Sequence, residues 1–184
     1  MTRPVVAAIL AAGQSTRMAS KKSKVVHSLA GRPLISYPIE LAQSLDLSEI
    51  YVLVGCPHEE DVKRAIQNKR VKFVRQKEPK GTGDALNSLH PILKKKDVDI
   101  LVLPGDAPLL TPETLRAFLD FHQEKVGIAT VMTAEIPDPT GYGRIVRSSG
   151  DRILMIVEEV DAFPEEKKIK EVNSGIYLFS SKPL

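Results

Sequence analysis

Short apolar runs alternate with amphipathic stretches along the first two thirds of the chain. Four runs are rich in aliphatic and β-branched residues: Val5–Leu10, Ile50–Val54, Val71–Val74 and Asp99–Leu103. Such runs are typical of strands buried on both faces of a parallel sheet. Helical spacing of apolar residues recurs in the stretches between and after them, over Leu34–Leu45, Glu59–Gln67, Thr82–His90 and Thr111–Glu124. The alternation predicts an α/β fold with a Rossmann-like, mostly parallel central sheet flanked by helices.

Prolines mark where two of these helices begin or end. Thr111 precedes Pro112 and Glu113, which is the order of an N-cap, a first-turn proline and a first-turn acid. Pro91 follows the third helical stretch directly. We expect it to kink or end that helix, because proline lacks the amide hydrogen that a helix interior uses.

The last third of the chain has a different pattern. Four stretches with strand character follow one another there: Gly127–Ala134, Gly143–Val146, Arg152–Glu158 and Val172–Phe179. A weak helical pattern lies only near Glu165–Lys170. This pattern predicts an antiparallel β extension of the sheet, or a hairpin flap. No linker or repeat interrupts the sequence, so we expect one domain over residues 1–184.

The apolar segment near the start has two interpretations. Arg3 followed by Val5–Ala12 resembles a short secretory leader. The same residues also suit a buried strand that carries a glycine loop to a phosphate. We favour the strand, because a cleaved leader would take the first strand away from the sheet.

The composition limits the cellular compartments and the classes of binding partner that we expect for this protein. No apolar run approaches the ~18–20 residues that span a bilayer, so no membrane partner is expected. Cys56 is the single cysteine, which favours a reducing, cytoplasmic location.

Net charge is +3, yet six basic residues and no acidic residue precede Glu40. Such a cluster suits a solvated surface, a nucleic-acid site or a nucleoside triphosphate. With 5% aromatic residues and no tryptophan, few side chains can stack on bases, so no nucleic-acid partner is expected.

Three segments carry candidate site residues. After the first strand, the small residues Ala11, Ala12 and Gly13 allow a ligand to approach the backbone, and Arg17 and Lys24 supply cations for phosphate oxygens.

The second segment follows the fourth strand, where Asp106 is a hard oxygen donor suited to Mg²⁺. The alternative for Asp106 is a turn aspartate that bonds its own backbone. In the third segment Gln76 has a donor and an acceptor for a base edge, and Gly81 permits close approach. The alternative for this segment is an ordinary loop that caps a helix through Thr82.

Together these segments resemble the sugar-phosphate nucleotidyltransferase superfamily. They are most similar to the uridyltransferase domain of bacterial bifunctional N-acetylglucosamine-1-phosphate uridyltransferases. Leu10–His27 resembles its L-A-A-G-x-G-T-R-M and K-V-x-H pattern, Gln76–Ala85 its Q-x-x-x-x-G-T-G-x-A, and Gly105–Leu109 its G-D-x-P-L. Gly141–Val146, Ile156–Ala162 and Glu171–Gly175 resemble its G-Y-G-R-I, I-V-E-x-x-D-A and E-x-N-[TS]-G segments. The resemblance covers essentially the whole chain and implies a nucleotide-diphospho-sugar transferase fold.

The resemblance also implies a reaction and a set of roles. UMP would pass from UTP to N-acetylglucosamine 1-phosphate, giving UDP-N-acetylglucosamine and pyrophosphate. Arg17 and Lys24 would be the catalytic cations, and Asp106 would hold Mg²⁺. The nucleotide would lie against Leu10, Ala11, Ala12, Gly13, Gln76, Gly81 and Thr82. Gly143, Glu158 and Asn173 would bind the sugar. Residues 1–125 would then be a nucleotide-binding half and residues 126–184 a sugar-binding half.

This sequence also departs from the family. Ser15 and Ser23 stand where the family has glycine and proline. The family domain continues past the equivalent of residue 184 with a second metal ligand and often a trimerising β-helix. We therefore expect a truncated, monomeric domain with weak turnover. Another sugar phosphate, CTP or GTP in place of UTP, and a nucleotide-binding fragment with little catalysis remain as alternatives.

Overall fold

The computed structural model describes residues 3–13, 20, 22–66, 70–77, 81–125, 127–148 and 152–181. The chain divides into two compact units. The first comprises Met1–Thr130 and Tyr177–Leu184, and the second comprises Val131–Ile176.

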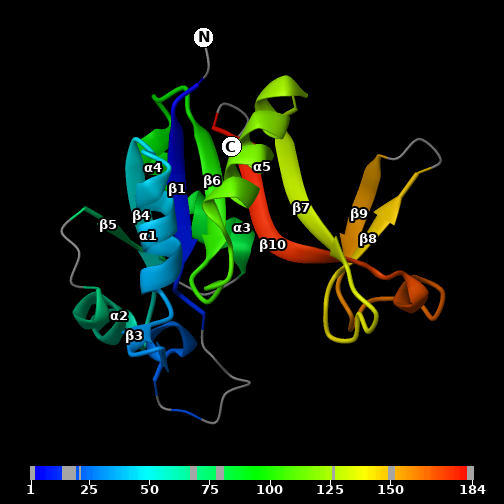
Figure 1. Cartoon of the computed structure of the whole chain (residues 1–184), viewed down its shortest axis with the longest axis horizontal. Coiled ribbons are helices and arrows are strands. Elements are labelled where there is room, and N and C mark those ends of the chain that lie inside the picture. Colours follow the sequence, from blue (N-terminus) through cyan, green and yellow to red (C-terminus); the bar gives the residue numbers. More distant parts are fainter. Residues whose placement is uncertain are drawn as a thin grey trace. The chain divides into compact units, whose positions relative to one another are not determined.

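A parallel sheet forms the centre of the first unit (Figure 1). Its strands are, in order across the sheet, β5 (Lys72–Arg75), β4 (Glu49–Val54), β1 (Val5–Leu10) and β6 (Asp99–Pro104). The last residues of β10 (Glu171–Ser180) pair antiparallel with β6. The expected mostly parallel α/β sheet is confirmed. The chain runs from β1 outward to β4 and β5 and then crosses back to β6 on the other side of β1. The direction of the strand order thus reverses between β1 and β6, and ligands bind at the carboxyl ends of the strands at such a point.

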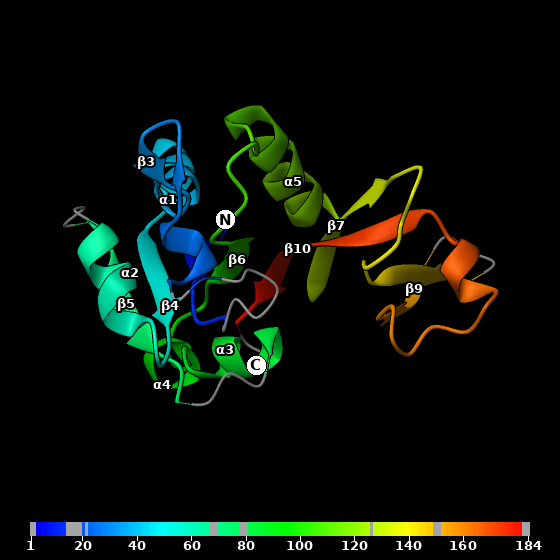
Figure 2. The same ribbon diagram turned by 90° about the horizontal axis from the view of Figure 1, so that it is seen from below.

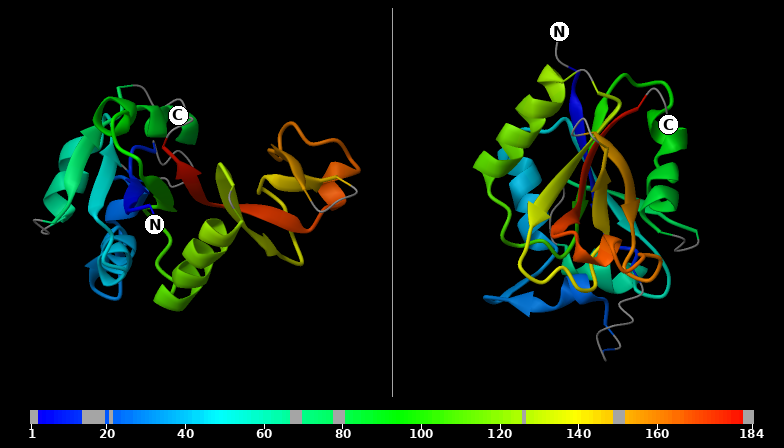
Figure 3. Two further views of the ribbon diagram at one scale, coloured as in Figure 1. Left: turned by 90° about the horizontal axis from the view of Figure 1, so that it is seen from above. Right: turned by 90° about the vertical axis from the view of Figure 1, so that its right-hand side faces the viewer.

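Helices cover both faces of this sheet (Figures 2 and 3). On one face α3 (Thr82–Asn87) and α4 (His90–Leu93) pack against alternate residues of the central strands, including Val6, Ala8 and Tyr51. The strand residues in between face the other way, where α1 (Ser36–Ser44) and α5 (Pro112–Glu124) lie. The remaining short elements of this unit are α2 (Glu59–Ala65), η1 (Lys24–Val26) and a small hairpin of β2 (Ser28–Leu29) and β3 (Arg32–Pro33).

The helix boundaries test two of the sequence signals. Thr111 caps α5 as expected, since its Oγ1 accepts a hydrogen bond from the Thr114 N–H at 3.2 Å. The expectation for Pro91 is wrong. The first helix, α3, already ends at Asn87, and Pro91 lies in the first turn of the separate helix α4. A first-turn proline interrupts no helical hydrogen bond, so Pro91 is accommodated at a helix start.

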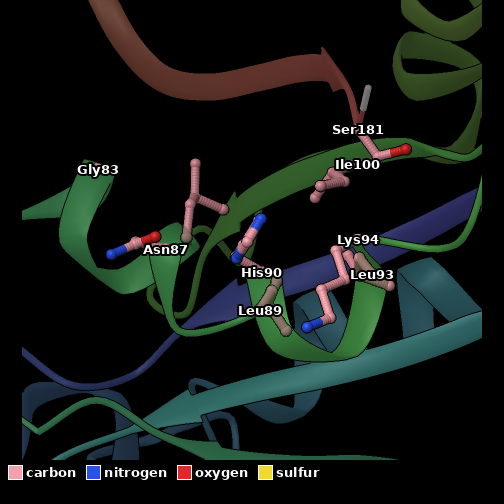
Figure 4. A pocket seen from close by; sticks show the side chains of 9 residues that line it. Gly83, Asn87, Leu89, His90, Leu93, Lys94, Ile100 and Ser181 are labelled. Carbon is pink, nitrogen blue, oxygen red and sulfur yellow. The ribbon is translucent and has the colours of Figure 1, made fainter. Parts of the chain in front are cut away.

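A small pocket lies on the α3 and α4 side of the sheet (Figure 4). Its walls come from those two helices, from Ile100 of β6 and from Ser181 after β10. Leucine and isoleucine make up four of the nine lining residues, and Asn87, His90 and Lys94 also line the pocket. Within the ranges described above, no helix is long and apolar enough to cross a membrane.

The second unit consists of antiparallel strands. β8 (Arg144–Arg147) pairs with β9 (Ile153–Val157), and the first part of β10 pairs with β8 and with β7 (Ala129–Glu135). The expected antiparallel extension is confirmed, and the weak helical pattern corresponds to a 3₁₀ turn, η2 (Glu166–Lys168). Residues 177–181 belong to the first unit because β10 continues alongside β6. The division into a nucleotide-binding half and a sugar-binding half at residue 125 stays a prediction.

A charged cluster stabilises the amino edge of the parallel sheet. The Glu49 carboxylate accepts hydrogen bonds from Lys72, from Lys96 at 2.5 Å and from the Tyr51 hydroxyl at 2.5 Å. Hydrogen bonds from these donors, Lys72 first, lower the pKa of Glu49 from 4.5 to about 2. Burial is the largest cause that raises the pKa of Tyr51 to about 12.

This cluster makes stability depend on pH. A depressed carboxyl pKa contributes stability that is complete above pH ~4.5 and is lost as the pH falls toward 2. We expect Glu49→Gln to lower the free energy of unfolding by ~1–2 kcal/mol at pH 6, because it removes the charge that the two lysines neutralise. The effect is no larger because solvent partly screens the exposed lysines. Urea denaturation of both proteins at pH 6 and pH 2.5 should show this difference shrinking. A difference that is the same at both pH values would contradict the prediction.

Candidate active site

The loop after β1 leaves its backbone open at the carboxyl edge of the sheet. The Ala11 N–H donates to the Leu53 carbonyl of β4 at 2.9 Å, which fixes the start of the loop. Ala11 and Ala12 are buried, whereas Gly13 is exposed. Among the described residues, a Cβ atom built on Gly13 would meet no atom within 4 Å. The contact of these small residues with a nucleotide stays a prediction.

Gly105 holds the end of β6 close to the end of β1. Its N–H donates to the Leu10 carbonyl at 3.0 Å. A Cβ atom on Gly105 would lie 2.6 Å from that same carbonyl oxygen and 3.0 Å from Cγ1 of Val25. Only glycine permits this approach, and it brings the following residue, Asp106, beside the loop after β1.

Lys24 and Asp106 form an ion pair at this edge. The distance between Lys24 Nζ and Asp106 Oδ2 is 2.7 Å, and the two side chains are 42% and 32% exposed. These residues lie far apart in the sequence, one at the start of η1 and the other just after β6. A partly exposed cation beside a carboxylate can bind phosphate oxygens and a hard metal ion together.

The donor set at this edge fits a metal ion that is shared with a substrate. Among the described residues, no group of three or more His, Cys, Asp or Glu side chains is placed to hold a metal ion. Magnesium in phosphoryl-transfer sites is usually held by one or two carboxylates together with substrate phosphates. A single partly exposed carboxylate such as Asp106 matches that pattern and does not match an all-protein cage.

Gln76 lies at the same edge, directly after β5. Its N–H donates to the Val54 carbonyl at the end of β4 at 2.8 Å. Its side chain is buried, and Nε2 donates to Asp84 Oδ2 at 2.7 Å and to the Gly81 carbonyl at 3.4 Å. Gly81 has φ +111°, a conformation that favours glycine, and Thr82 begins α3 directly after it. The interpretation as a helix cap through Thr82 is therefore wrong, because Gly81 takes the N-cap position.

Arg17 falls outside the described residues, as does Ser15. Its assignment to the triphosphate stays a prediction. Ser23 is described, and it stands where the resemblance places a proline.

Ser23 has a conformation that suits proline. Its φ is −57° and its ψ is 141°, and its N–H donates no hydrogen bond within the described residues. It is 1% exposed, and its Oγ is buried without a partner in that part of the chain. We expect Ser23→Pro to raise the free energy of unfolding by ~1 kcal/mol, because it removes an unpaired hydroxyl and restricts the unfolded chain.

The control for this change is Ser23→Ala, which removes the hydroxyl but leaves φ unrestricted. Thermal denaturation should rank proline above alanine and alanine above serine. A proline variant that melts below the alanine variant would show that the backbone does not accept the ring.

In the second unit, the three residues assigned to the sugar lie together. A Cβ atom built on Gly143 would come within 3.1 Å of Glu158 Oε1, and the Gly143 carbonyl accepts from the Asn173 N–H at 2.9 Å. The Asn173 Oδ1 accepts from the Gly175 N–H at 3.0 Å. Glycine at 143 thus lets the backbone come closer to the Glu158 carboxylate than a residue with a side chain would.

Arg144 and Glu159 support the same loop from within. Arg144 NH2 donates to Glu159 Oε2 at 2.6 Å, and NH1 donates to the Tyr142 carbonyl. The Gly141 N–H donates to the same carboxylate oxygen at 3.2 Å. Hydrogen bonds from Arg144 first, and then from Gly141, lower the pKa of Glu159.

A family model described as the MobA-like NTP transferase domain matches residues 7–166 of the chain. The chain belongs to this family. The resemblance inferred from the motifs to nucleotidyltransferases is therefore confirmed at the level of the family.

Curated relatives share its sequence over nearly its whole length. It is 42% identical over 178 residues to the bifunctional protein GlmU of Brevibacillus brevis, a match that covers 97% of this chain and 38% of the relative. It is 45% identical over 178 residues to the bifunctional protein GlmU of Alkaliphilus metalliredigens, again over 97% of this chain and 38% of the relative. The chain thus spans less than two fifths of the length of these relatives.

Solved structures share the fold. A putative glucose-1-phosphate thymidylyltransferase from Bacillus anthracis, in complex with a sucrose, superposes with a TM-score of 0.79 at 22% identity, covering 97% of this chain and 72% of that one. A UDP-glucose pyrophosphorylase complexed with UDP-glucose gives a TM-score of 0.76 at 19% identity, covering 98% and 76%. These similarities confirm the nucleotide-diphospho-sugar transferase fold.

Three contacting residues were not among the sequence candidates: Asp84, Arg144 and Glu159. Each lies inside a motif that the sequence analysis quotes, next to or near a residue it selects. Asp84 orients the Gln76 amide, and Arg144 with Glu159 holds the loop around Gly143. Motif membership was the available signal, but their partners became evident only in three dimensions.

Proposed function

We propose that the protein transfers UMP from UTP to N-acetylglucosamine 1-phosphate, giving UDP-N-acetylglucosamine and pyrophosphate. The observation that carries the proposal is the Lys24–Asp106 pair beside the open loop of Gly13. It combines a cation, a metal-binding carboxylate and accessible backbone at the edge where α/β sheets bind nucleotides. The 42–45% identity to proteins named GlmU supports the choice of sugar and nucleotide.

The chemistry requires positioning and charge neutralisation more than a protein nucleophile. An oxygen of the sugar 1-phosphate attacks the α-phosphorus of UTP, and the bond to the leaving pyrophosphate breaks. Lys24, together with Arg17, binds the phosphates and balances the charge that develops on their oxygens. Asp106 would hold Mg²⁺, which neutralises phosphate charge when bound.

Gln76 would read the base. Its amide nitrogen already donates to Asp84 and to the Gly81 carbonyl, so the amide oxygen would accept from the N3–H of uracil, a donor that cytosine lacks at N3. The hydrogen bond to Asp84 fixes which way the amide nitrogen points, so the side chain presents one pattern and not its reverse. In the second unit, Gly143, Glu158 and Asn173 would bind the sugar. The reaction would take place in the cytoplasm, a reducing compartment that suits the single Cys56.

The test is a calorimetric titration with UTP, CTP and GTP, each in the presence of Mg²⁺. We expect UTP to bind most tightly. The variant Gln76→Ala should lose the preference for UTP over CTP, whereas Asn87→Ala, an exposed amide on α3, should keep it. If CTP or GTP binds best, the assignment of uridine is wrong.

A second measurement separates an enzyme from a binding domain. If the protein is an enzyme, Arg17→Ala should lower the rate of UDP-N-acetylglucosamine formation by orders of magnitude. If it is only a binding domain, the same change should remove only part of its affinity for UTP. Wild-type protein that binds UTP yet forms no product with any sugar 1-phosphate would contradict the proposed reaction.

A further inference from the structure

Arg144 is buried within the small antiparallel second unit. Its side chain is 2% exposed, whereas that of its partner Glu159 is 30% exposed. Its Nε is buried without a partner among the described residues. Burying an arginine in this way costs free energy that a well-packed apolar side chain would not. The pair is therefore poorly explained as a device for stability alone.

The contacts of this arginine converge on one loop. NH1 donates to the Tyr142 carbonyl, and NH2 donates to Glu159 Oε2, which also accepts from the Gly141 N–H. The backbone is thus held at two successive residues before Gly143. Gly141 has φ +84°, so the chain turns sharply just where the carboxylate anchors it.

These anchors decide where the amide of Gly143 points. The peptide between Tyr142 and Gly143 is trans, so its carbonyl and its N–H point in opposite directions. Because the carbonyl points to Arg144, the Gly143 N–H points away from it. In the described part of the chain this N–H donates to no protein atom. It therefore remains an oriented donor close to the Glu158 carboxylate, whose Oε1 lies 3.1 Å from the place that a Cβ atom on Gly143 would take.

We propose that Arg144, held by Glu159, is a positioning residue for the sugar. It orients the Tyr142–Gly143 peptide so that the Gly143 N–H and the Glu158 carboxylate serve the same ligand, one as a donor and the other as an acceptor. A ligand with both hydroxyl and amide groups complements this pair. This inference rests on the proposed function, because it takes the sugar phosphate as the ligand of this loop.

The test compares steady-state kinetics of Arg144→Met with those of the wild-type protein. We expect the KM for N-acetylglucosamine 1-phosphate to rise about tenfold, while the KM for UTP stays within about twofold. A purely structural role would reduce the fraction of folded enzyme, which lowers kcat and leaves both KM values unchanged.

Arg147→Met is the matched control. Arg147 lies on the same strand and also pairs with a carboxylate, since its NH2 is 2.6 Å from Glu171 Oε1, and this partner lies on β10 and not in the loop of residues 141–143. Both KM values should stay within about twofold in this variant. Nuclear magnetic resonance relaxation of the Gly143 amide gives a readout without substrate. Its order parameter should fall from about 0.85 to below about 0.6 in Arg144→Met and stay high in Arg147→Met.

The outcomes separate the two proposals. Wild-type protein without turnover of any sugar phosphate overturns the proposed function and this inference with it. An active wild type whose KM for the sugar phosphate is unchanged in Arg144→Met overturns the inference alone. If Arg144→Met does not fold, Arg144→Lys decides in the same way. The guanidinium reaches Tyr142 and Glu159 from two separate nitrogens, whereas lysine has a single nitrogen in place of this planar fork, so the KM should still rise. An unchanged KM in that variant overturns the inference.

Discussion

Replacing Lys24 with methionine should lower kcat/KM for UTP by about a thousandfold, which corresponds to ~4 kcal/mol of lost transition-state stabilisation. Methionine keeps the length of the side chain and removes the charge that lies 2.7 Å from Asp106. The loss should be concentrated in kcat, because charge develops on the phosphate oxygens as the reaction proceeds. Steady-state kinetics with saturating sugar phosphate measure the effect.

Lys22→Met is the control for this experiment. Lys22 belongs to the same basic cluster and is exposed, so its replacement lowers the positive field without removing the contact at the carboxyl edge. Its kcat/KM should stay within about threefold of the wild-type value. Equal losses in the two variants would mean that the cluster attracts the nucleotide only through its overall charge. A Lys24→Met variant that keeps normal kinetics would remove the main support for the proposed site.

Replacing Gly105 with alanine should destabilise the protein by ~3 kcal/mol and abolish nucleotide binding. The added Cβ would lie 2.6 Å from the Leu10 carbonyl oxygen and 3.0 Å from Val25. The Leu10 carbonyl cannot move aside easily, because it accepts the hydrogen bond from Gly105 and its strand pairs on both sides. Any shift that relieves the clash also moves Asp106 away from Lys24.

Gly83→Ala provides the comparison. Gly83 lies within α3, and a Cβ atom there would meet nothing within 4 Å in the part of the chain that the structure describes. Alanine is the better helix former, so this change should stabilise the protein by ~0.5–1 kcal/mol. Chemical denaturation of both variants, followed by UTP titration of each, tests the pair. Similar stability of the two variants would show that the approach of β6 to β1 is looser than the structure indicates.

The sequence was most informative where neighbouring residues decide the structure. The cap of α5 by Thr111 and the four parallel strands follow from local patterns of capping and burial. Pro91 was harder to interpret. Its position in the first turn of α4 depends on where α3 ends, and the pattern of apolar residues does not mark that end.

The candidate site divides in the same way. Sequence motifs selected residue types suited to phosphates, a metal ion and a sugar, and the family that they suggested agrees with the matching family model. They did not show that Asp84 holds Gln76 or that Arg144 holds the Tyr142 carbonyl. A hydrogen bond between side chains depends on distances that arise from folding, and a motif records only their order along the chain.

The sequence by itself thus determined the α/β class, the segments that form buried strands and the chemical types of the residues at the carboxyl edge. These features depend on periodicity and on residue chemistry. Only the tertiary structure decided that β10 returns to pair with β6, that Lys24 meets Asp106, and that Glu159 anchors Arg144. Each of these contacts joins residues that are separated along the chain. Such a contact stabilises the protein only after the intervening segment has folded and the entropy cost of closing that loop has been met. Local sequence patterns therefore do not predict it.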